Sequence, residues 1–257
     1  MSWKILSSTV TGTSHIKRNE QGQDYCRAGV IQHAEREYFI GLAADGAGST
    51  KNGGAGAGTA CETAYAAILA TLRNTDNLYE VPESRIREWV QAARDSVRVR
   101  AEKSDLPIRD FASTLIGAVV GSDHAIFFQI GDGAAVISEG DGYQAVFWPD
   151  QGEYANTTFF LTDETFSERL RIARKDSALD EIAIFTDGLQ NLVLSFSGRT
   201  AHTGFFRPLF LAMKKNPGNE FTDLSCHLRN LLASDDINNR SDDDKTLVLA
   251  VRTPAVP

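Results

Sequence analysis

The chain has 257 residues, of which 42% are hydrophobic and 23% are charged, so it can bury a core and is not disordered as a whole. With 26 Lys and Arg residues against 34 Asp and Glu residues, its formal net charge is −8. This acidity argues against broad contact with nucleic-acid phosphates or anionic lipids. A local anion site is still compatible with it if metal cations supply the positive charge.

Short runs rich in Val, Ile, Phe and Thr predict strands, and longer stretches with apolar residues at steps of three and four predict helices. In chain order we expect strands 5–11 and 38–44, then helices 55–73 and 83–103. Next come strands 114–121, 125–130, 134–138, 144–148 and 158–161, helix 164–174, strand 181–186, helices 205–214 and 222–233, and strand 246–251.

The order of these elements bears on the fold class. Strands and helices do not alternate strictly, which disfavours a doubly wound parallel sheet and favours mainly antiparallel sheets that carry helices in pairs, an α+β fold. No internal repeat and no Pro- or Ser-rich linker interrupts the chain. We therefore expect one domain over residues 1–257.

Cysteine usage and hydropathy bear on location. Cys26, Cys61 and Cys226 are few, odd in number and far apart, which is typical of a reducing compartment. The first residues lack the apolar stretch of a signal peptide, and no run approaches the roughly 18 apolar residues of a membrane span. We expect a cytoplasmic protein that contacts neither membrane nor nucleic acid.

The most informative feature is a set of aspartates at the ends of apolar runs. Asp45, Asp132 and Asp187 each follow such a run, Asp24 precedes one, and 242–244 precede the last. Strand ends can bring carboxylates together, where they repel one another unless a cation joins them. Oxygen ligands without nearby Cys or His favour Mg²⁺ or Mn²⁺ over Zn²⁺.

An Asp-Gly hairpin turn is the alternative explanation, and it is the better one for any single aspartate. Two positions fit it less well. Asp45 is followed by a glycine-rich stretch over 46–58 that opens a helix, which suggests backbone held close to a ligand. Asp187 runs into the apolar segment 189–194, which does not resemble a returning strand.

Other chemistries find no motif in the sequence. Lys51 follows Ser49 and Thr50 instead of preceding them, so the glycine-rich stretch is not a P-loop. The chain also lacks GxGxxG, a GxSxG nucleophile elbow and an HxxxH pair. A nucleotide-phosphate cradle, a serine hydrolase and a His-based zinc site are therefore disfavoured.

Six motifs resemble, in the same order, those of the PP2C (PPM) metal-dependent Ser/Thr protein phosphatases. They are Gln23-Asp24, the Ala-Asp-Gly-Ala-Gly-Ser run at 44–49, Ser-Thr-Leu at 113–115, Ile-Gly-Asp-Gly at 130–133, Phe-Thr-Asp-Gly at 185–188 and Asp-Asp-Lys-Thr at 243–246. The match covers about residues 10–251 and is similar to a short bacterial branch of the family. The resemblance implies a central antiparallel β-sandwich flanked by pairs of α-helices, in αββα layers.

The resemblance also implies a site with two Mn²⁺ or Mg²⁺ ions and room for a third. Asp45 would bridge both ions, and Asp243 is preferred to Asp244 because Thr246 fixes the register of the last motif. The metal ligands carried over in this way are the Gly46 carbonyl and the carboxylates of Asp24, Asp45, Asp132, Asp187 and Asp243. The implied reaction is direct hydrolysis of a phosphomonoester by water activated between the two cations.

The sequence departs from the family pattern at three places. Ala47 stands where many relatives have a histidine that protonates the leaving group, and His15 is a candidate replacement, with a hydrogen-bonded surface histidine as an equal alternative. Asn19 stands where relatives have a phosphate-binding arginine, and Arg18 is a candidate, with a solvated basic turn as the alternative. Asn191 replaces an aspartate of the third metal site.

Our leading hypothesis is a phosphoserine/phosphothreonine protein phosphatase that acts as a monomer on phosphorylated products of a bacterial Ser/Thr kinase. One alternative is a catalytically weak regulatory module of the same shape that binds a phosphoprotein. Another is a phosphatase of small phosphoesters, because specificity would depend on the segment 150–174, which we expect to be a mobile flap.

Overall fold

The computed structural model describes all residues except 1, 34, 76, 149–157, 217–221 and 255–257. Its strands form two five-stranded sheets in which every paired neighbour is antiparallel. The first sheet has the order β1 (Ser2–Val10), β12 (Lys245–Thr253), β9 (Glu181–Phe185), β6 (Ala134–Glu139) and β7 (Gly142–Ala145). The second has the order β2 (Tyr25–His33), β3 (Arg36–Ala44), β4 (Leu115–Val120), β5 (Ala125–Ile130) and β8 (Arg171–Lys175).

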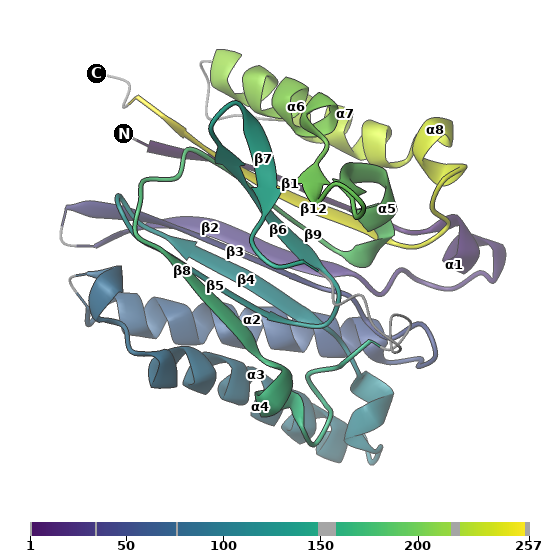
Figure 1. Ribbon diagram of the computed structural model, residues 1–257. Coiled ribbons are helices and arrows are strands. Elements are labelled where there is room, and N and C mark those ends of the chain that lie inside the picture. The colour runs from purple at the N-terminus through teal and green to yellow at the C-terminus, as the bar shows by residue number, and fades with distance from the viewer. Residues whose placement is uncertain (1, 34, 76, 149–157, 217–221, 255–257) are drawn as a thin grey trace.

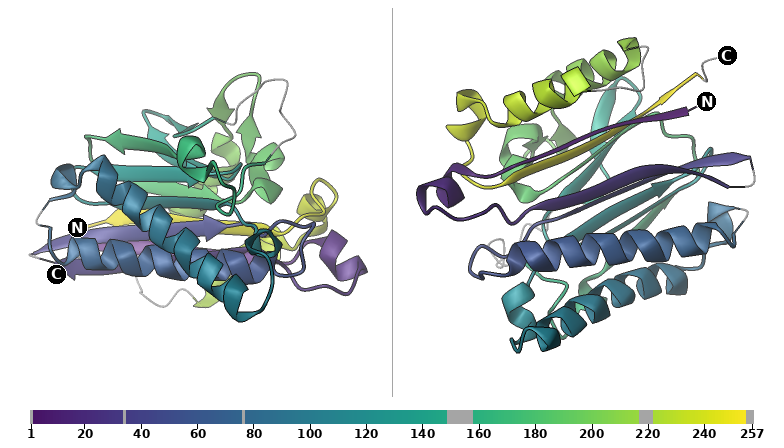
Figure 2. Two further views of the ribbon diagram at one scale, coloured as in Figure 1. Left: turned by 90° about the horizontal axis from the view of Figure 1, so that it is seen from below. Right: turned by 180° about the vertical axis from the view of Figure 1, so that it is seen from behind.

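The helices lie in pairs on the outer faces of the two sheets (Figures 1 and 2). The second sheet is covered by α2 (Gly53–Leu72) and α3 (Glu83–Lys103), and the first by α6 (Thr203–Lys215) and α7 (Thr222–Leu232). The shorter elements are α1 (Thr13–Lys17), α4 (Phe166–Arg169), α5 (Gln190–Val193), α8 (Asp235–Asn238), the 3₁₀ turns Leu78–Glu80, Ile108–Phe111 and Asp187–Leu189, and the hairpin of β10 (Leu194–Ser195) and β11 (Thr200–Ala201). The expected αββα layering is confirmed.

Strand side chains alternate between two apolar environments because both faces of each sheet are covered. In β3, Ile40 and Leu42 pack with the helices α2 and α3, whereas Phe39 and Ala43 pack against the other sheet. This double burial explains why the sequence shows nearly continuous apolar runs instead of alternating polar and apolar residues.

Two expected elements are wrong, and β2, β8 and the short hairpin of β10 and β11 were not expected as strands. Of the helix expected over 164–174, only the short helix α4 forms, and the chain then enters β8, which pairs with β5 at the edge of its sheet. The strand expected at 158–161 is absent from the described residues there, and the strand β2 was missed. Both β2 and β8 are edge strands with few buried side chains, so their sequences carry a weak hydrophobic period.

The pairing registers align several loops at one end of the sandwich. The start of β2 pairs with the end of β3, and the start of β4 with the end of β5. In the other sheet, the end of β9 lies beside the starts of β6 and β12. The two chain termini lie together at the opposite end, where Ser2 pairs with Thr253 (Figure 1).

Two further expectations concern membranes and thiols. Within the part of the chain that the structure describes, no helix combines the length and the apolar character needed to cross a membrane. Cys26, Cys61 and Cys226 are free thiols, as expected from their spacing.

Candidate metal centre

The loops at the end of the sandwich opposite the two chain termini carry the aspartates singled out in the sequence. Asp24 directly precedes β2 and Asp45 directly follows β3. Asp132 lies between β5 and β6, Asp187 begins the turn after β9, and Asp243 stands two residues before β12. Antiparallel pairing therefore brings together carboxylates from five separate segments of the chain.

The backbone of Asp45 and Gly46 is fixed by hydrogen bonds from both sides. The Asp45 N–H donates to Thr114 Oγ1 at 2.9 Å, and the Thr114 N–H donates to the Asp45 carbonyl at 2.8 Å. The Gly46 N–H donates to the Gln23 carbonyl at 3.2 Å. A Cβ at Gly46 would lie 2.2 Å from the Gly53 carbonyl carbon, so only glycine permits the first turn of α2 to pack here.

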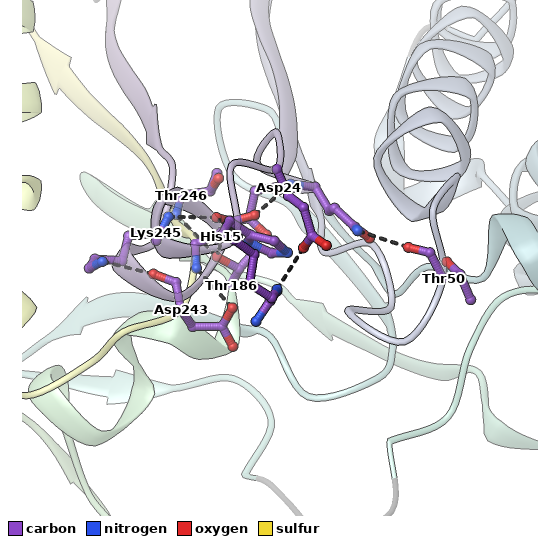
Figure 3. Close-up of polar contacts among 12 residues, drawn as sticks. His15, Asp24, Thr50, Thr186, Asp243, Lys245 and Thr246 are labelled. Carbon is purple, nitrogen blue, oxygen red and sulfur yellow. Dashed lines mark hydrogen bonds and ion pairs between the residues drawn. The ribbon is translucent and has the colours of Figure 1, made fainter.

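Asp24 is held by a threonine from the other sheet. Thr186 Oγ1 donates to Asp24 Oδ2 at 2.7 Å and accepts from the Thr246 N–H at 3.1 Å. Figure 3 shows these three residues meeting beside Asp243. The second carboxylate oxygen of Asp24, Oδ1, is buried and has no hydrogen-bond partner among the described residues.

The carboxylates shift one another's pKa values upward. Burial, followed by the charges of Asp24, Asp187 and Asp243, raises the pKa of Asp45 to about 11. Burial and then the charges of Asp132 and Asp243 raise the pKa of Asp187 to about 8. Burial is also the main reason why the pKa of Asp24 rises to about 7. Near neutral pH the cluster cannot be fully ionised unless positive charge is added.

The donor set fits divalent cations. Asp132 Oδ1, like Asp24 Oδ1, is buried without a partner among the described residues, while Thr158 Oγ1 donates to Asp132 Oδ2 at 2.6 Å. Orphaned buried carboxylate oxygens are unfavourable unless something binds them. Among the described residues, however, no three His, Cys, Asp or Glu side chains are placed so that they could hold a metal ion together as they stand.

The two candidate catalytic residues of the N-terminal segment, His15 and Arg18, lie in different surroundings. His15 is buried, with 3% of its surface exposed, and its Nδ1 lies 3.0 Å from Asp244 Oδ1. Arg18 ends α1 on the surface, where its Nε donates to Glu20 Oε2 at 2.7 Å. Neither interaction was expected from the sequence, and Arg18 is held by an acidic neighbour in the chain.

The other positions where the sequence departs from the family pattern are also placed. Ala47 is buried, and its N–H donates to the Ala112 carbonyl at 2.9 Å. Asn191 is exposed in α5. Asp243 contributes to the raised pKa values of Asp45 and Asp187, whereas Asp244, with 1% of its surface exposed, contributes to the raised pKa of Asp24.

Sequence reasoning missed several polar residues that hold the aspartates in place. Three of these side chains are buried. Thr186 donates to Asp24, Thr114 accepts from the Asp45 N–H, and Gln129 donates to the two carbonyls that flank Asp132. A signal was present, because each is a polar residue at the end of an apolar run and within three residues of a quoted motif or inside one. Their partners could not be assigned without the sheet register.

Comparison with known proteins gives a consistent result. Residues 11–233 match the family model described as Protein phosphatase 2C. The chain is 34% identical over 253 residues to serine/threonine-protein phosphatase 3 of Escherichia coli (strain K12), an alignment that covers 98% of this chain and 99% of that protein.

Solved structures resemble the fold at lower identity. The serine/threonine phosphatase Stp1 from Staphylococcus aureus superposes with a TM-score of 0.65 at 15% identity, covering 98% of this chain and 96% of that one. The catalytic domain of the serine/threonine protein phosphatase PstP, solved in complex with two manganese ions, has a TM-score of 0.60 at 14% identity and covers 98% of this chain and 99% of that one.

Proposed function

Since this chain belongs to the protein phosphatase 2C family and is a serine/threonine phosphatase of that type, we propose that it hydrolyses phosphoserine and phosphothreonine in proteins with two divalent cations held by its aspartate cluster. The observation that carries the proposal is the group of buried carboxylates at one end of the sandwich, whose pKa values are raised by burial and by one another's charges. A cluster of this kind is costly to the fold and is best explained by a ligand of opposite charge.

The residues that would hold the cations follow from their positions. Asp45 lies centrally, since three other aspartates of the cluster act on it. With the Gly46 carbonyl and Asp24 it would hold one ion, and with Asp187 and Asp243 the other. Asp132, whose charge acts on Asp187, would contribute to a weaker third site with Asp187. Mn²⁺ and Mg²⁺ suit a shell made of oxygen ligands.

Bound cations would supply activation of a water molecule at neutral pH and neutralisation of charge on the phosphoryl oxygens. The chain itself keeps the ligands in place: Thr186 orients Asp24, and Thr114 fixes the Asp45 backbone on both of its polar groups. Ala47 carries no titratable group, so this position contributes nothing to protonation of the leaving serine or threonine oxygen.

The test measures hydrolysis of p-nitrophenyl phosphate and of a phosphothreonine peptide, with Mn²⁺ and with chelator. Asp45→Ala is expected to abolish turnover and to weaken Mn²⁺ binding. Asp176→Ala is the matched control, since Asp176 is exposed and follows β8 at the opposite end of the sandwich. Metal-independent turnover, or full activity of Asp45→Ala, would overturn the proposal.

The alternatives appear as other outcomes of the same experiment. Mn²⁺ binding without turnover of either substrate would favour a regulatory module that binds phosphoproteins. Turnover of small phosphoesters with none of the peptide would favour a small-molecule phosphatase. The peptide substrate would come from the class of phosphoproteins made by Ser/Thr kinases, which is the chemistry that this reaction reverses.

A further inference from the structure

The carboxylate of Asp244 lies behind the aspartate cluster and is fully used by partners from the N-terminal segment. Its Oδ1 accepts the Gly12 N–H at 2.6 Å and faces His15 Nδ1 at 3.0 Å, and its Oδ2 accepts the Gln23 N–H at 2.5 Å. All of these groups are buried. Both oxygens of this carboxylate are therefore engaged by groups of the N-terminal segment.

These bonds fasten both ends of one segment to the start of β12. Gly12 precedes α1, and Gln23 directly precedes the metal-ligand candidate Asp24. The Ser14 N–H adds a bond to the Asp242 carbonyl at 2.9 Å. The position of Asp24 relative to β12 is therefore set through Asp244.

Close backbone packing surrounds the same residue. A Cβ at Gly12 would lie 2.3 Å from the Asp243 carbonyl carbon, and a Cβ at Gly188 would lie 1.9 Å from the Asp244 carbonyl oxygen. The segments that carry Asp24, Asp187 and Asp243 thus all meet at Asp244. Its carboxylate contacts the segment that carries Asp24, and its backbone packs against the turn that carries Asp187.

His15 is part of this attachment. The ring is buried, Nδ1 is taken by Asp244, and Nε2 is buried with no hydrogen-bond partner among the described residues. Because a proton donor to the leaving group must reach solvent or substrate, this environment disfavours the general-acid role considered from the sequence. It is the expected environment of a side chain that orients another buried group.

We propose that His15 and Asp244 form a positioning pair that keeps Asp24 aligned with Asp187 and Asp243, and that His15 is not the general acid. The proposal rests on the proposed function, because the aligned carboxylates matter as metal ligands. A carboxylate suits the task because its two oxygens can accept all three donors. A neutral asparagine at position 244 would turn an NH₂ group, which cannot accept a hydrogen bond, toward one of these donors.

The test compares two substitutions of His15 by Mn²⁺ titration calorimetry on the full chain. His15→Asn keeps an N–H donor near the place of Nδ1, and His15→Phe removes it. We expect Mn²⁺ affinity to fall by roughly 10–100-fold in His15→Phe and to stay within a few-fold of wild type in His15→Asn. Equal affinity in all three proteins would overturn the proposal.

A matched control separates positioning from general destabilisation. Thr71→Val removes the partly buried bond from Trp89 Nε1 to Thr71 Oγ1, which is 2.8 Å long and joins α3 to α2. It is expected to lower the unfolding temperature without changing Mn²⁺ affinity. If it weakens Mn²⁺ binding as much as His15→Phe does, the specific role of His15 is refuted.

Leaving-group dependence distinguishes the pair from a general acid. At limiting Mn²⁺, a positioning defect lowers kcat/KM by the same factor for p-nitrophenyl phosphate and for the phosphothreonine peptide. Saturating Mn²⁺ then restores kcat/KM for both. Loss of a general acid would reduce hydrolysis of the phosphothreonine peptide much more than that of p-nitrophenyl phosphate, in both His15 variants and with unchanged Mn²⁺ affinity. That second pattern would overturn our assignment.

A second variant covers the case in which His15→Phe does not fold. In Asp244→Asn, the amides of Gly12 and Gln23 should exchange with solvent faster than in wild type when metal-free protein is measured. Mn²⁺ affinity should fall by a factor similar to that expected for His15→Phe. Unchanged exchange at both amides would refute the attachment whatever the activity. A wild-type chain that binds no Mn²⁺ would instead overturn the proposed function itself, and with it the role of the pair.

Discussion

The hydroxyl of Thr186 donates a hydrogen bond of 2.7 Å to Oδ2 of Asp24, across 162 residues of sequence. Thr186 directly follows β9 of one sheet, and Asp24 directly precedes β2 of the other. The bond joins the two sheets at the end of the sandwich where the aspartates gather. It leaves Asp24 Oδ1 without a partner among the described residues, and this is the oxygen that would face a cation in the proposed site.

Removal of this hydroxyl should weaken metal binding. In Thr186→Val, Asp24 loses its donor and the Thr246 N–H loses its acceptor, so we expect Mn²⁺ affinity to fall about 10-fold or more. Thr186→Ser keeps the hydroxyl and should stay near wild type. The comparison is made by calorimetry and by the Mn²⁺ dependence of p-nitrophenyl phosphate hydrolysis. Equal affinities for the two variants would contradict this expectation.

Asp45→Asn should inactivate the protein and stabilise its metal-free form. The carboxyl of Asp45, whose pKa is raised to about 11 by burial and neighbouring charges, is in an unfavourable environment that a neutral amide relieves. An increase of about 1 kcal/mol in the free energy of unfolding would raise the unfolding temperature by roughly 2–4 °C in a domain of this size. Thermal unfolding at neutral pH with chelator measures it, and a lower unfolding temperature than wild type would be evidence against the clustered carboxylates.

The stability of the metal-free protein should decrease as pH rises. Asp24 and Asp187 titrate near 7 and 8 in the folded chain instead of near 3.8, so between these values the unfolded chain loses its protons first. Their contribution is therefore neutral below about pH 4 and increasingly destabilising up to the folded pKa. We expect a falling unfolding temperature from about pH 5 to about pH 8, and a flatter profile in Asp24→Asn/Asp187→Asn.

Added Mn²⁺ should reverse this loss. A ligand that binds only the folded chain stabilises it by about 2.7 kcal/mol at 100 times its Kd. Because protons and cations compete for the same carboxylates, the gain in unfolding temperature should be larger near pH 8 than near pH 5. A gain that is independent of pH would argue that Mn²⁺ binds elsewhere.

Gln129 should matter for the loop that carries Asp132. Its amide donates to the Gly131 carbonyl at 2.8 Å and to the Gly133 carbonyl at 2.6 Å, one on each side of Asp132. Gln129→Met leaves both acceptors without this donor, and we expect the free energy of unfolding to fall by roughly 1–3 kcal/mol. Gln144→Met on the edge strand β7, where Gln144 is half-buried, is the control and should cost little. Equal losses in thermal unfolding would rule out a special role for Gln129.

Most of the architecture follows from local sequence patterns. The bounds of α3 and β5 agree with those expected, because apolar residues at helical spacing and a continuous run of buried residues are strong signals. The edge strand β8 was expected as part of a helix, since its residues are only partly buried and carry little periodicity. Pairing with β5 decides its conformation, and pairing is a property of the sheet.

For the candidate ligands, too, some features follow from the sequence and others from the pairing of distant segments. The sequence by itself determined which aspartates stand at strand ends and that mainly antiparallel sheets carry helices in pairs, and the family resemblance implied the αββα layers. Only the tertiary structure decided that Asp244 lies buried against His15 while its neighbour Asp243 joins the cluster. Adjacent residues of an extended chain point in opposite directions, and the register of sheets built from distant segments decides which side faces which partner. Local patterns carry no information about that register, so the bonds from Thr186 to Asp24 and from His15 to Asp244 became visible only in the folded chain.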